Sequence, residues 1–400
     1  MNDRSHPNVR KIAGVSRQEL ERRWKLVRDH LKERRIDCLI AVTTDSANST
    51  GYTRWLTDAT GAYRHVVVFH ADGPMTVVVH GFHGTRREIT GEDPQNPGVG
   101  EVLNVAMFPA VNYSQPYEAL AVADMLKRRG YKRVALANPS GMPHVFVEAV
   151  KATVGTGGEV IDETEAFDRW QAIKSAEEKD FLMQAIRMQD SVFATLMKKI
   201  KPGMRDLEVA SIIHYEGRLL GSTHGTIMAG SAPPGQPAPI LPPNAQGRTI
   251  ERGDYMSVLL ENTGPGGYFA EVARPVSLGK PSSELVEAFE KVKEAQAYST
   301  SLMKPGADPK EIFAAYNERL KKLGLPVEGR IHSHAQGYDI VQRPLIRFDE
   351  TMKLEPDMFF AVHPAEQKPN VFTFVCDNLL ITKDGNSGWL HKTERKIFEL

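Results

Sequence analysis

The chain has 400 residues, which is longer than one ordinary domain and favours two. It carries 50 basic and 50 acidic side chains, and this balance argues against a nucleic-acid partner, which would favour a basic excess. With 41% hydrophobic and 25% charged residues, the chain does not have the composition of a disordered protein.

Neither the cysteines nor the apolar segments point to export or to a membrane. Cys38 and Cys376 are too few for a disulfide framework. The first residues contain no apolar core of signal-peptide length, and no stretch reaches the ~18 apolar residues of a membrane span. We therefore expect a cytoplasmic protein with no membrane partner.

The first half of the chain alternates helical and strand patterns. Residues 16–35 have apolar residues at every third or fourth position, which predicts an amphipathic helix, and Ser16 with Glu19 matches a helix-capping pattern. Helices interleaved with short apolar strands indicate an α/β domain that ends near residue 165. Further along, we expect a helix at 117–129 and strands at 37–42, 65–70, 75–80 and 133–137.

The second half contains an internal duplication. A helical pattern ends at Lys201-Pro-Gly203, and a second one ends at Lys304-Pro-Gly306, an offset of 103 residues. The same offset relates Asp254 to Asp357, each of which precedes a hydrophobic strand. Two copies of such a unit would bring their strands together around a cleft to which both copies contribute residues.

Two segments resemble motifs of the creatinase, prolidase and aminopeptidase P superfamily. Trp170-Gln-Ala-Ile-Lys-Ser-Ala-Glu-Glu178 resembles its R-x-I-K-S-x-x-E junction, and Gly267-Tyr-Phe-Ala-Glu-Val-Ala-Arg274 resembles its G-Y-x-x-D-x-T-R hairpin. The resemblance implies an α+β "pita-bread" catalytic domain with a pseudo-twofold duplication at residues 169–400. It also implies a smaller α/β creatinase-like domain at residues 1–168 and a homodimer.

The metal site of the superfamily is altered in this sequence. The resemblance implies that metal-dependent members hold two divalent ions with two Asp, one His and two Glu, because hard cations need clustered carboxylates. Matched position by position, the five ligands fall on Leu260 (with Glu261 beside it), Glu271, His334, His363 and Cys376. Because leucine cannot ligate a metal, we expect no metal cofactor and a ligand-deficient member of creatinase or ectoine-hydrolase type.

These positions favour a metal-independent hydrolase that cleaves a C–N bond of a small nonpeptide molecule. Three alternatives stay open: a lyase or decarboxylase on the same fold, a hydrolase with one zinc ion, and a non-catalytic binding protein. Zinc is chemically sensible for His334, His363, Cys376 and Glu271. A conventional two-metal hydrolase is disfavoured by the loss of carboxylates.

Four residues are the candidate catalytic groups. His334 could transfer protons, because the pKa of an unperturbed histidine lies near neutrality. Glu271 or Glu261 could act as a base, a nucleophile or an anion that pairs with a cationic substrate. Because side chains alternate along a strand, Glu261 and Leu260 should point to opposite faces. Glu261 could then face the cleft or lie exposed at the end of the strand, and both positions stay open. His363 occupies a ligand position and completes the set.

A second group of residues is expected to contact the substrate. Tyr52, Arg54 and Trp55 belong to a loop, residues 48–55, that family dimers tend to send toward the partner's active site. The resemblance to creatinase implies a catalytic histidine in the loop before the R-G-D segment. The matching Pro-rich segment 231–243 contains none, so we do not expect creatine as the substrate. The remaining candidates for substrate contact are Arg64, His224, His332, Tyr338, Cys376 and Asp377.

Overall fold

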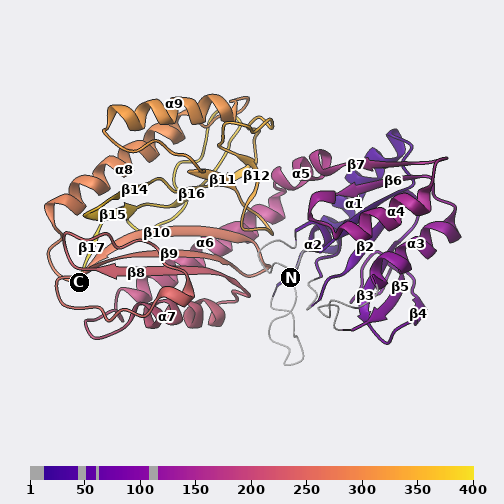
Figure 1. Ribbon diagram of the computed structural model, residues 1–400, viewed down its shortest axis with the longest axis horizontal. Coiled ribbons are helices and arrows are strands. Elements are labelled where there is room, and N and C mark those ends of the chain that lie inside the picture. The colour runs from indigo at the N-terminus through magenta and orange to yellow at the C-terminus, as the bar shows by residue number, and fades with distance from the viewer. Residues whose placement is uncertain (1–12, 44–50, 60–62, 108–115) are drawn as a thin grey trace. The chain divides into compact units, whose positions relative to one another are not determined.

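The computed structural model describes residues 13–43, 51–59, 63–107 and 116–400. It divides into two compact units, Val15–Gln171 and one that contains Ala172–Leu400 (Figure 1). The two units are treated separately below, and the boundary expected between residues 168 and 169 stays a prediction. Within the described ranges, no helix is both long enough and apolar enough to cross a membrane.

The N-terminal unit is an α/β domain built on one seven-stranded mixed sheet. Its strand order is β4-β5-β3-β2-β1-β6-β7, with β1 antiparallel to β2 and parallel to β6. The strands are β1 (Cys38–Val42), β2 (Val66–His70), β3 (Met75–Gly81), β4 (Arg86–Glu88), β5 (Val99–Ala106), β6 (Arg133–Ala137) and β7 (Glu159–Asp162). The helices are α1 (Arg17–Glu33), α2 (Gly51–Thr57), α3 (Tyr117–Arg129), α4 (His144–Val154) and α5 (Thr164–Ala172).

Local sequence explains most of these elements. Ser16 caps α1 by accepting a hydrogen bond from the Glu19 backbone N–H, as the capping pattern predicts. Strand β1 is buried along its whole length, which explains its continuous apolar run. The strands predicted at 37–42, 65–70, 75–80 and 133–137 and the helix at 117–129 are present, whereas α2, α4, α5, β4, β5 and β7 are additional elements.

The C-terminal unit has the expected pita-bread α+β fold, in which two helical layers enclose strands (Figure 1). The first half of the duplication contains α6 (Ala176–Leu196), α7 (Asp206–Leu219), β8 (Gly225–Ala232), β9 (Tyr255–Thr263) and β10 (Phe269–Ser277). The second half contains α8 (Ser283–Leu302), α9 (Pro309–Lys322), β11 (Ser333–Ala335), β12 (Gln342–Leu345), β13 (Phe359–Val362), β14 (Ala365–Lys368), β15 (Val371–Phe374), β16 (Asp377–Leu380) and β17 (Phe398–Glu399).

The two halves repeat one local structure at the stop of their first helix. Gly203 and Gly306 both have positive φ, 93° and 80°, which glycine adopts without the cost of a Cβ. The Gly203 N–H donates to the carbonyl of Ile250 at 2.8 Å, and the Gly306 N–H donates to the carbonyl of Leu354 at 2.7 Å. Equivalent turns with equivalent partners agree with the duplication seen in the sequence.

Backbone hydrogen bonds join the two four-stranded sheets of this unit. Their orders are β17-β10-β9-β8 and β12-β11-β13-β16. Ala273 of β10 and Cys376, just before β16, exchange backbone hydrogen bonds of 3.3 and 3.2 Å. This bridge brings the end of the second half against the central hairpin of the first half, and it positions the residues discussed next.

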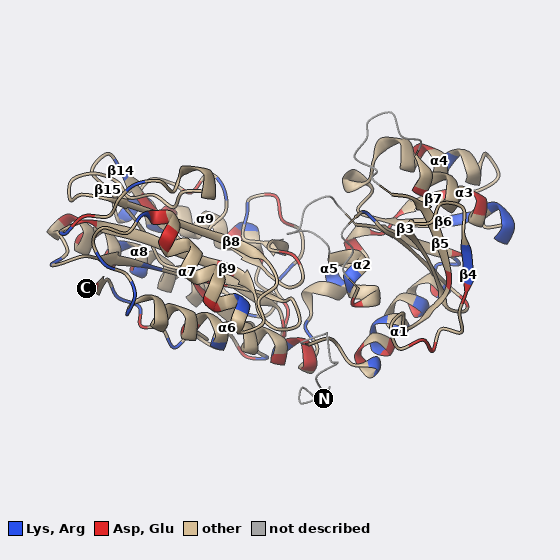
Figure 2. Cartoon of the chain, turned by 90° about the horizontal axis from the view of Figure 1, so that it is seen from below, with Lys and Arg blue, Asp and Glu red and all other residues tan. Residues whose placement is uncertain are grey.

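Charged side chains are distributed over both units. Figure 2 shows Lys and Arg interleaved with Asp and Glu along the helices, as expected for a chain with a net charge of zero. The pair of Arg274 and Asp377 is instead deeply buried: Arg274 donates to Asp377 at 2.6 Å, and neither side chain is exposed.

Candidate active site

The β9–β10 hairpin places two glutamates face to face. The strands are antiparallel in regular register, with Glu261 directly opposite Glu271, so both side chains lie on one face of the hairpin. Both are buried, and burial together with the nearness of Glu271 raises the pKa of Glu261. Glu261 therefore takes the inward position, not the exposed strand-end position.

Leu260 points the other way, into a hydrophobic core. It packs in the cluster that contains Ile227, Val258 and Val272, between the β8–β10 strands and helices α6 and α7. The residue of β9 that faces the site is thus Glu261, one position after the leucine matched by sequence spacing. Leu260 and Glu261 face opposite sides of the strand, because a difference of one residue in a strand reverses the direction of the side chain.

His334 approaches the glutamates from β11. Its Nε2 lies 3.8 Å from Oε2 of Glu271. Its Nδ1 lies 3.1 Å from the carbonyl oxygen of Ala335, to which only an N–H can donate. The lone pair of the neutral ring is therefore on Nε2, the nitrogen that faces Glu271.

His363 completes a group of three. It follows β13, is partly exposed, and has its ring centroid 5.0 Å from that of His334. One potential ligand atom from each of Glu271, His334 and His363 lies within 4.8 Å of the others. Oε2 of Glu271 is buried and has no hydrogen-bond partner among the described residues. An unpartnered carboxylate oxygen beside two imidazoles fits a divalent cation, and a donor set of two His and one Glu suits zinc.

Burial controls the protonation of this group. It lowers the pKa of His334 to about 4 and lowers the pKa of His363 well below its usual range, which favours the neutral, ligating form of both rings. Burial also raises the pKa of Glu271, and it raises the pKa of Glu261 with a further contribution from the neighbouring Glu271. A cation bound beside these groups would favour their ionised forms.

Cys376 and Asp377 lie beside the group, and both are fully buried. The Cys376 thiol points to the carbonyl oxygen of Glu271 at 3.7 Å, and burial raises its pKa, so the thiol is protonated at neutral pH. Asp377 pairs with Arg274 at 2.6 Å and with Arg395 at 3.3 Å. The contacts of these two residues are internal ones, and their predicted contact with substrate stays a prediction.

Three more residues predicted in this unit contact other side chains. His332 is fully buried, stacks on Tyr316 of α9 with ring centroids 3.6 Å apart, and faces the hydroxyl of Ser299 at 2.8 Å. Tyr338 stacks on Tyr268 with centroids 4.2 Å apart. The His224 ring lies edge-on to Phe269, and its Nδ1 is 2.8 Å from the hydroxyl of Thr223.

Four predicted residues belong to the N-terminal unit. Three of them come from the segment 48–55, whose first three residues, 48–50, lie outside the described residues. Tyr52 donates to Asp168 at 2.6 Å, and the buried Trp55 packs against Phe167. Arg54 is buried, whereas Arg64 is partly exposed. Their expected approach to a partner's active site stays a prediction.

The sequence analysis overlooked two buried amides behind the glutamates, Gln336 and Asn378. Nε2 of Gln336 donates to Oε1 of Glu261 at 3.0 Å, and Oδ1 of Asn378 accepts from the backbone N–H of Glu271 at 2.8 Å. Each lies two residues after a matched ligand position, His334 or Cys376. The period of two in a strand could have identified both.

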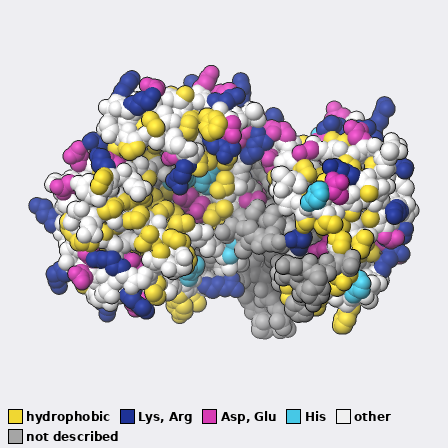
Figure 3. All heavy atoms as spheres, in the orientation of Figure 1, with side chains coloured by type: hydrophobic (Ala, Val, Ile, Leu, Met, Phe, Trp, Pro, Cys, Tyr) yellow, Lys and Arg dark blue, Asp and Glu magenta, His cyan; other side chains and the backbone are white. Residues whose placement is uncertain are grey.

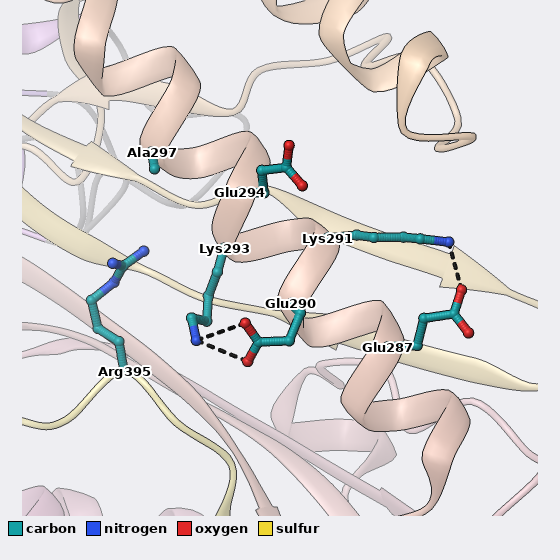
Figure 4. Close-up of a pocket in the computed structure, with 7 residues that line it drawn as sticks. All are labelled: Glu287, Glu290, Lys291, Lys293, Glu294, Ala297 and Arg395. Carbon is teal, nitrogen blue, oxygen red and sulfur yellow. Dashed lines mark hydrogen bonds and ion pairs between the residues drawn. The ribbon is translucent and has the colours of Figure 1, made fainter.

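The surface of the described part of the C-terminal unit also has an apolar area and a charged groove. Figure 3 shows apolar side chains gathered over the middle of the C-terminal unit, with acidic and histidine side chains among them. A separate groove of about 460 Å³ runs along α8 and is lined by charged side chains (Figure 4). Its carboxylates are already paired: Glu287 with Lys291 at 2.7 Å, Glu290 with Lys293 at 2.9 Å, and Glu294 with Arg319. We therefore assign the site to the Glu271 group.

The fold and the arrangement of the site define a hydrolase with a pita-bread catalytic domain. A profile of metallopeptidase family M24 matches residues 180–383, and the chain belongs to this family. The chain is 26% identical over 280 residues to the uncharacterized peptidase YqhT of Bacillus subtilis, covering 69% of this chain and 77% of that protein. It is 29% identical over 232 residues to the Xaa-Pro dipeptidase of Pyrococcus furiosus, covering 56% of this chain and 64% of the relative.

Solved structures show the same fold across nearly the whole chain. The Xaa-Pro dipeptidase from Bacillus anthracis superposes with a TM-score of 0.75 at 20% identity, covering 95% of this chain and 100% of that one. The X-Pro aminopeptidase from Thermotoga maritima also gives 0.75 at 20% identity, covering 94% and 99%.

These findings overturn the expected metal-independent hydrolase of a nonpeptide C–N bond. The relatives are named as peptidases, the family is one of metallopeptidases, and the structure brings Glu271, His334 and His363 together as a candidate metal site. The expectation failed for one physical reason. It counted the replacement of a carboxylate by His363 as a loss, although imidazole is itself a metal ligand and His363 lies with Glu271 and His334.

Proposed function

We propose that this protein is a metal-dependent hydrolase of short peptides, with one divalent ion held by Glu271, His334 and His363. The observation that carries this proposal is the convergence of their ligand atoms within 4.8 Å. The orientation of His334 supports it, because the Nδ1–H bond to Ala335 leaves Nε2 available. We thus propose a member of the family with one metal ion, in place of the metal-free subtype expected from the sequence.

A divalent ion in this position would supply a Lewis acid for the carbonyl of the scissile bond. Glu261 supplies the proton chemistry. Hydrolysis of an amide needs a base for the attacking water and an acid for the leaving nitrogen, and one carboxyl group with a raised pKa can perform both steps in turn. Glu261 has such a pKa, and it lies against the ligand Glu271 without belonging to the group of three.

The relatives indicate the class of substrate. Two of the proteins similar to this chain are named Xaa-Pro dipeptidases, and we propose that the scissile bond precedes proline in a dipeptide. The expected homodimer and the residue 168/169 domain boundary remain part of the proposal.

The test combines metal analysis with product analysis on the full-length protein. Metal-free protein is loaded separately with Zn²⁺, Mn²⁺ or Co²⁺, freed of excess ion, and given Xaa-Pro dipeptides and matched Xaa-Ala dipeptides. We expect about one equivalent of bound ion and cleavage of the Xaa-Pro bond. Mass spectrometry of the released amino acids measures the cleavage. Hydrolysis that persists unchanged in metal-free protein would contradict the proposal.

Two substitutions and a control locate the ion. His334→Ala and His363→Ala should each reduce the bound metal to a small fraction of an equivalent. His214→Ala, which changes an exposed histidine on α7, should retain it. Equal metal content in all three variants would place the ion elsewhere.

A further inference from the structure

Behind the two glutamates lies a pair of buried amide side chains, Gln336 and Asn378. Neither is exposed, and neither is a titratable group or a member of the candidate metal group. A buried amide is retained only where its donors and acceptors find partners, so their hydrogen bonds show what they do.

Backbone groups determine the orientation of Asn378. Its Oδ1 accepts from the N–H of Glu271 at 2.8 Å, and its Nδ2 donates to the carbonyl oxygen of Phe360 at 3.1 Å. Rotating the amide by half a turn would place NH₂ against an N–H and oxygen against a carbonyl, so only one orientation satisfies both neighbours.

Asn378 in turn determines the orientation of Gln336. Its Nδ2 also donates to Oε1 of Gln336 at 3.0 Å. The other end of the Gln336 amide, Nε2, is therefore the end that faces Oε1 of Glu261 at 3.0 Å and the carbonyl of Ile340 at 3.3 Å. Glu261 thus always meets a donor at Oε1.

His391 reinforces this orientation from the far side. Its Nε2 lies 3.1 Å from Oδ1 of Asn378, and its Nδ1 lies 3.3 Å from Oδ1 of Asp190 on α6. Because an amide oxygen can only accept, the Nε2–H of His391 is a second donor to Oδ1 of Asn378, beside the backbone N–H of Glu271. The series Asp190, His391, Asn378, Gln336, Glu261 is continuous from α6 to the site.

The geometry points to Asn378 and Gln336 as positioning residues that transmit a backbone-defined orientation to the carboxylate of Glu261 beside the ion site. This inference rests on the proposed function. It assigns to the two amides the role that outer-shell groups have at metal sites, where removing one typically costs about 10–100-fold in metal affinity or activity.

The test measures Co²⁺ binding to the full-length metal-free protein by visible absorption, which reports both affinity and ligand geometry. Gln336→Met keeps the length of the side chain and removes the donor that holds Glu261 beside the ligand Glu271. A displaced Glu261 would disturb Glu271, so we expect about 10–100-fold weaker binding with an altered spectrum. Asn378→Asp keeps the acceptor for Glu271 and loses the donor that orients Gln336, so it should have a similar effect. Because both act through one path, the double variant should lose little more than the weaker-binding single variant.

Gln246→Met is the matched control. Gln246 is also a buried amide that donates twice, to the carbonyls of Ile227 at 3.1 Å and Leu241 at 2.7 Å, but it contacts neither glutamate. Its replacement should lower thermal stability to a similar degree and leave the Co²⁺ affinity and spectrum unchanged.

The possible outcomes distinguish the proposed function from the positioning role of Asn378 and Gln336, called the relay below. If the unmodified protein binds no Co²⁺, the metal function fails and the relay fails with it. If the unmodified protein binds and Gln336→Met binds equally with the same spectrum, only the relay is overturned. Losses that add fully in the double variant also overturn it. If circular dichroism shows that Asn378→Asp does not fold, Gln336→Glu takes its place, because it sets a second carboxylate against Glu261. The relay then stands only if Gln336→Glu and Gln336→Met both weaken Co²⁺ binding.

Discussion

Glu261 and Glu271 lie directly opposite each other on adjacent strands, with both side chains buried. Burial raises the pKa of both, and the nearness of Glu271 raises that of Glu261 further. Two like charges this close are both ionised only at a cost, so in the absence of a cation the pair favours a shared proton. His334, with its Nε2 3.8 Å from Glu271, adds the neutral nitrogen that makes the pair suitable for a cation.

Glu261→Gln should separate catalysis from ion binding. The amide keeps the size of the side chain and an oxygen for Gln336, but it cannot accept a proton from water. We expect kcat for the best dipeptide to fall by about 10²–10⁴-fold, the usual contribution of a positioned acid–base group. Bound metal should remain near one equivalent. Glu290→Gln on the surface of α8 is the control. A kcat of Glu261→Gln equal to that of Glu290→Gln would exclude Glu261 as the base.

His363→Glu should change which metal the site prefers. Imidazole suits zinc, whereas a carboxylate suits harder ions such as Mn²⁺. In competition between equal concentrations of Mn²⁺ and Zn²⁺, the Mn²⁺-to-Zn²⁺ ratio in the purified protein should rise relative to the unmodified chain, measured by elemental analysis. An unchanged ratio would mean that His363 does not contact the ion.

Arg274→Met should strongly destabilise the protein, because it leaves the fully buried Asp377 with only Arg395, 3.3 Å away. Removing one partner of a buried pair costs about 3–5 kcal/mol in the free energy of unfolding. Urea unfolding should show this loss, and Asp377→Leu in the same chain should recover part of it. Lys293→Met breaks an exposed pair with Glu290 and should cost less than about 1 kcal/mol. Equal losses in the two variants would argue against a structural role of the buried pair.

His70 should make the N-terminal unit sensitive to acid. Burial, with a smaller effect of Arg129, lowers its pKa from its ordinary value to about 3. Because the unfolded chain binds this proton first, the stability that neutral His70 contributes is complete above pH ~6.5 and is lost as pH falls toward 3. His70→Gln, which cannot titrate, should flatten this part of the curve in urea unfolding between pH 7 and pH 4. An identical pH slope in both proteins would contradict the expectation.

The sequence predicted the fold better than the site. Apolar periodicity located α1 and the strands β1 and β6, because an amphipathic helix or a buried strand is a local pattern. The paired Lys-Pro-Gly turns at Gly203 and Gly306 revealed the duplication. The elements it did not predict include the short edge strands β4 and β7, whose sequences have little apolar pattern.

For the site, the sequence by itself determined which residue types are present: two glutamates on one hairpin, two histidines in the second half, and a family resemblance that joins them. Only the tertiary structure decided which of them meet. Strand register turned Glu261 inward and Leu260 into the core, and the pairing of the two sheets brought β10, β11 and β13 together. Register depends on contacts between strands that are distant in sequence, and one residue of shift reverses every side chain, so residue spacing along the chain could not decide it.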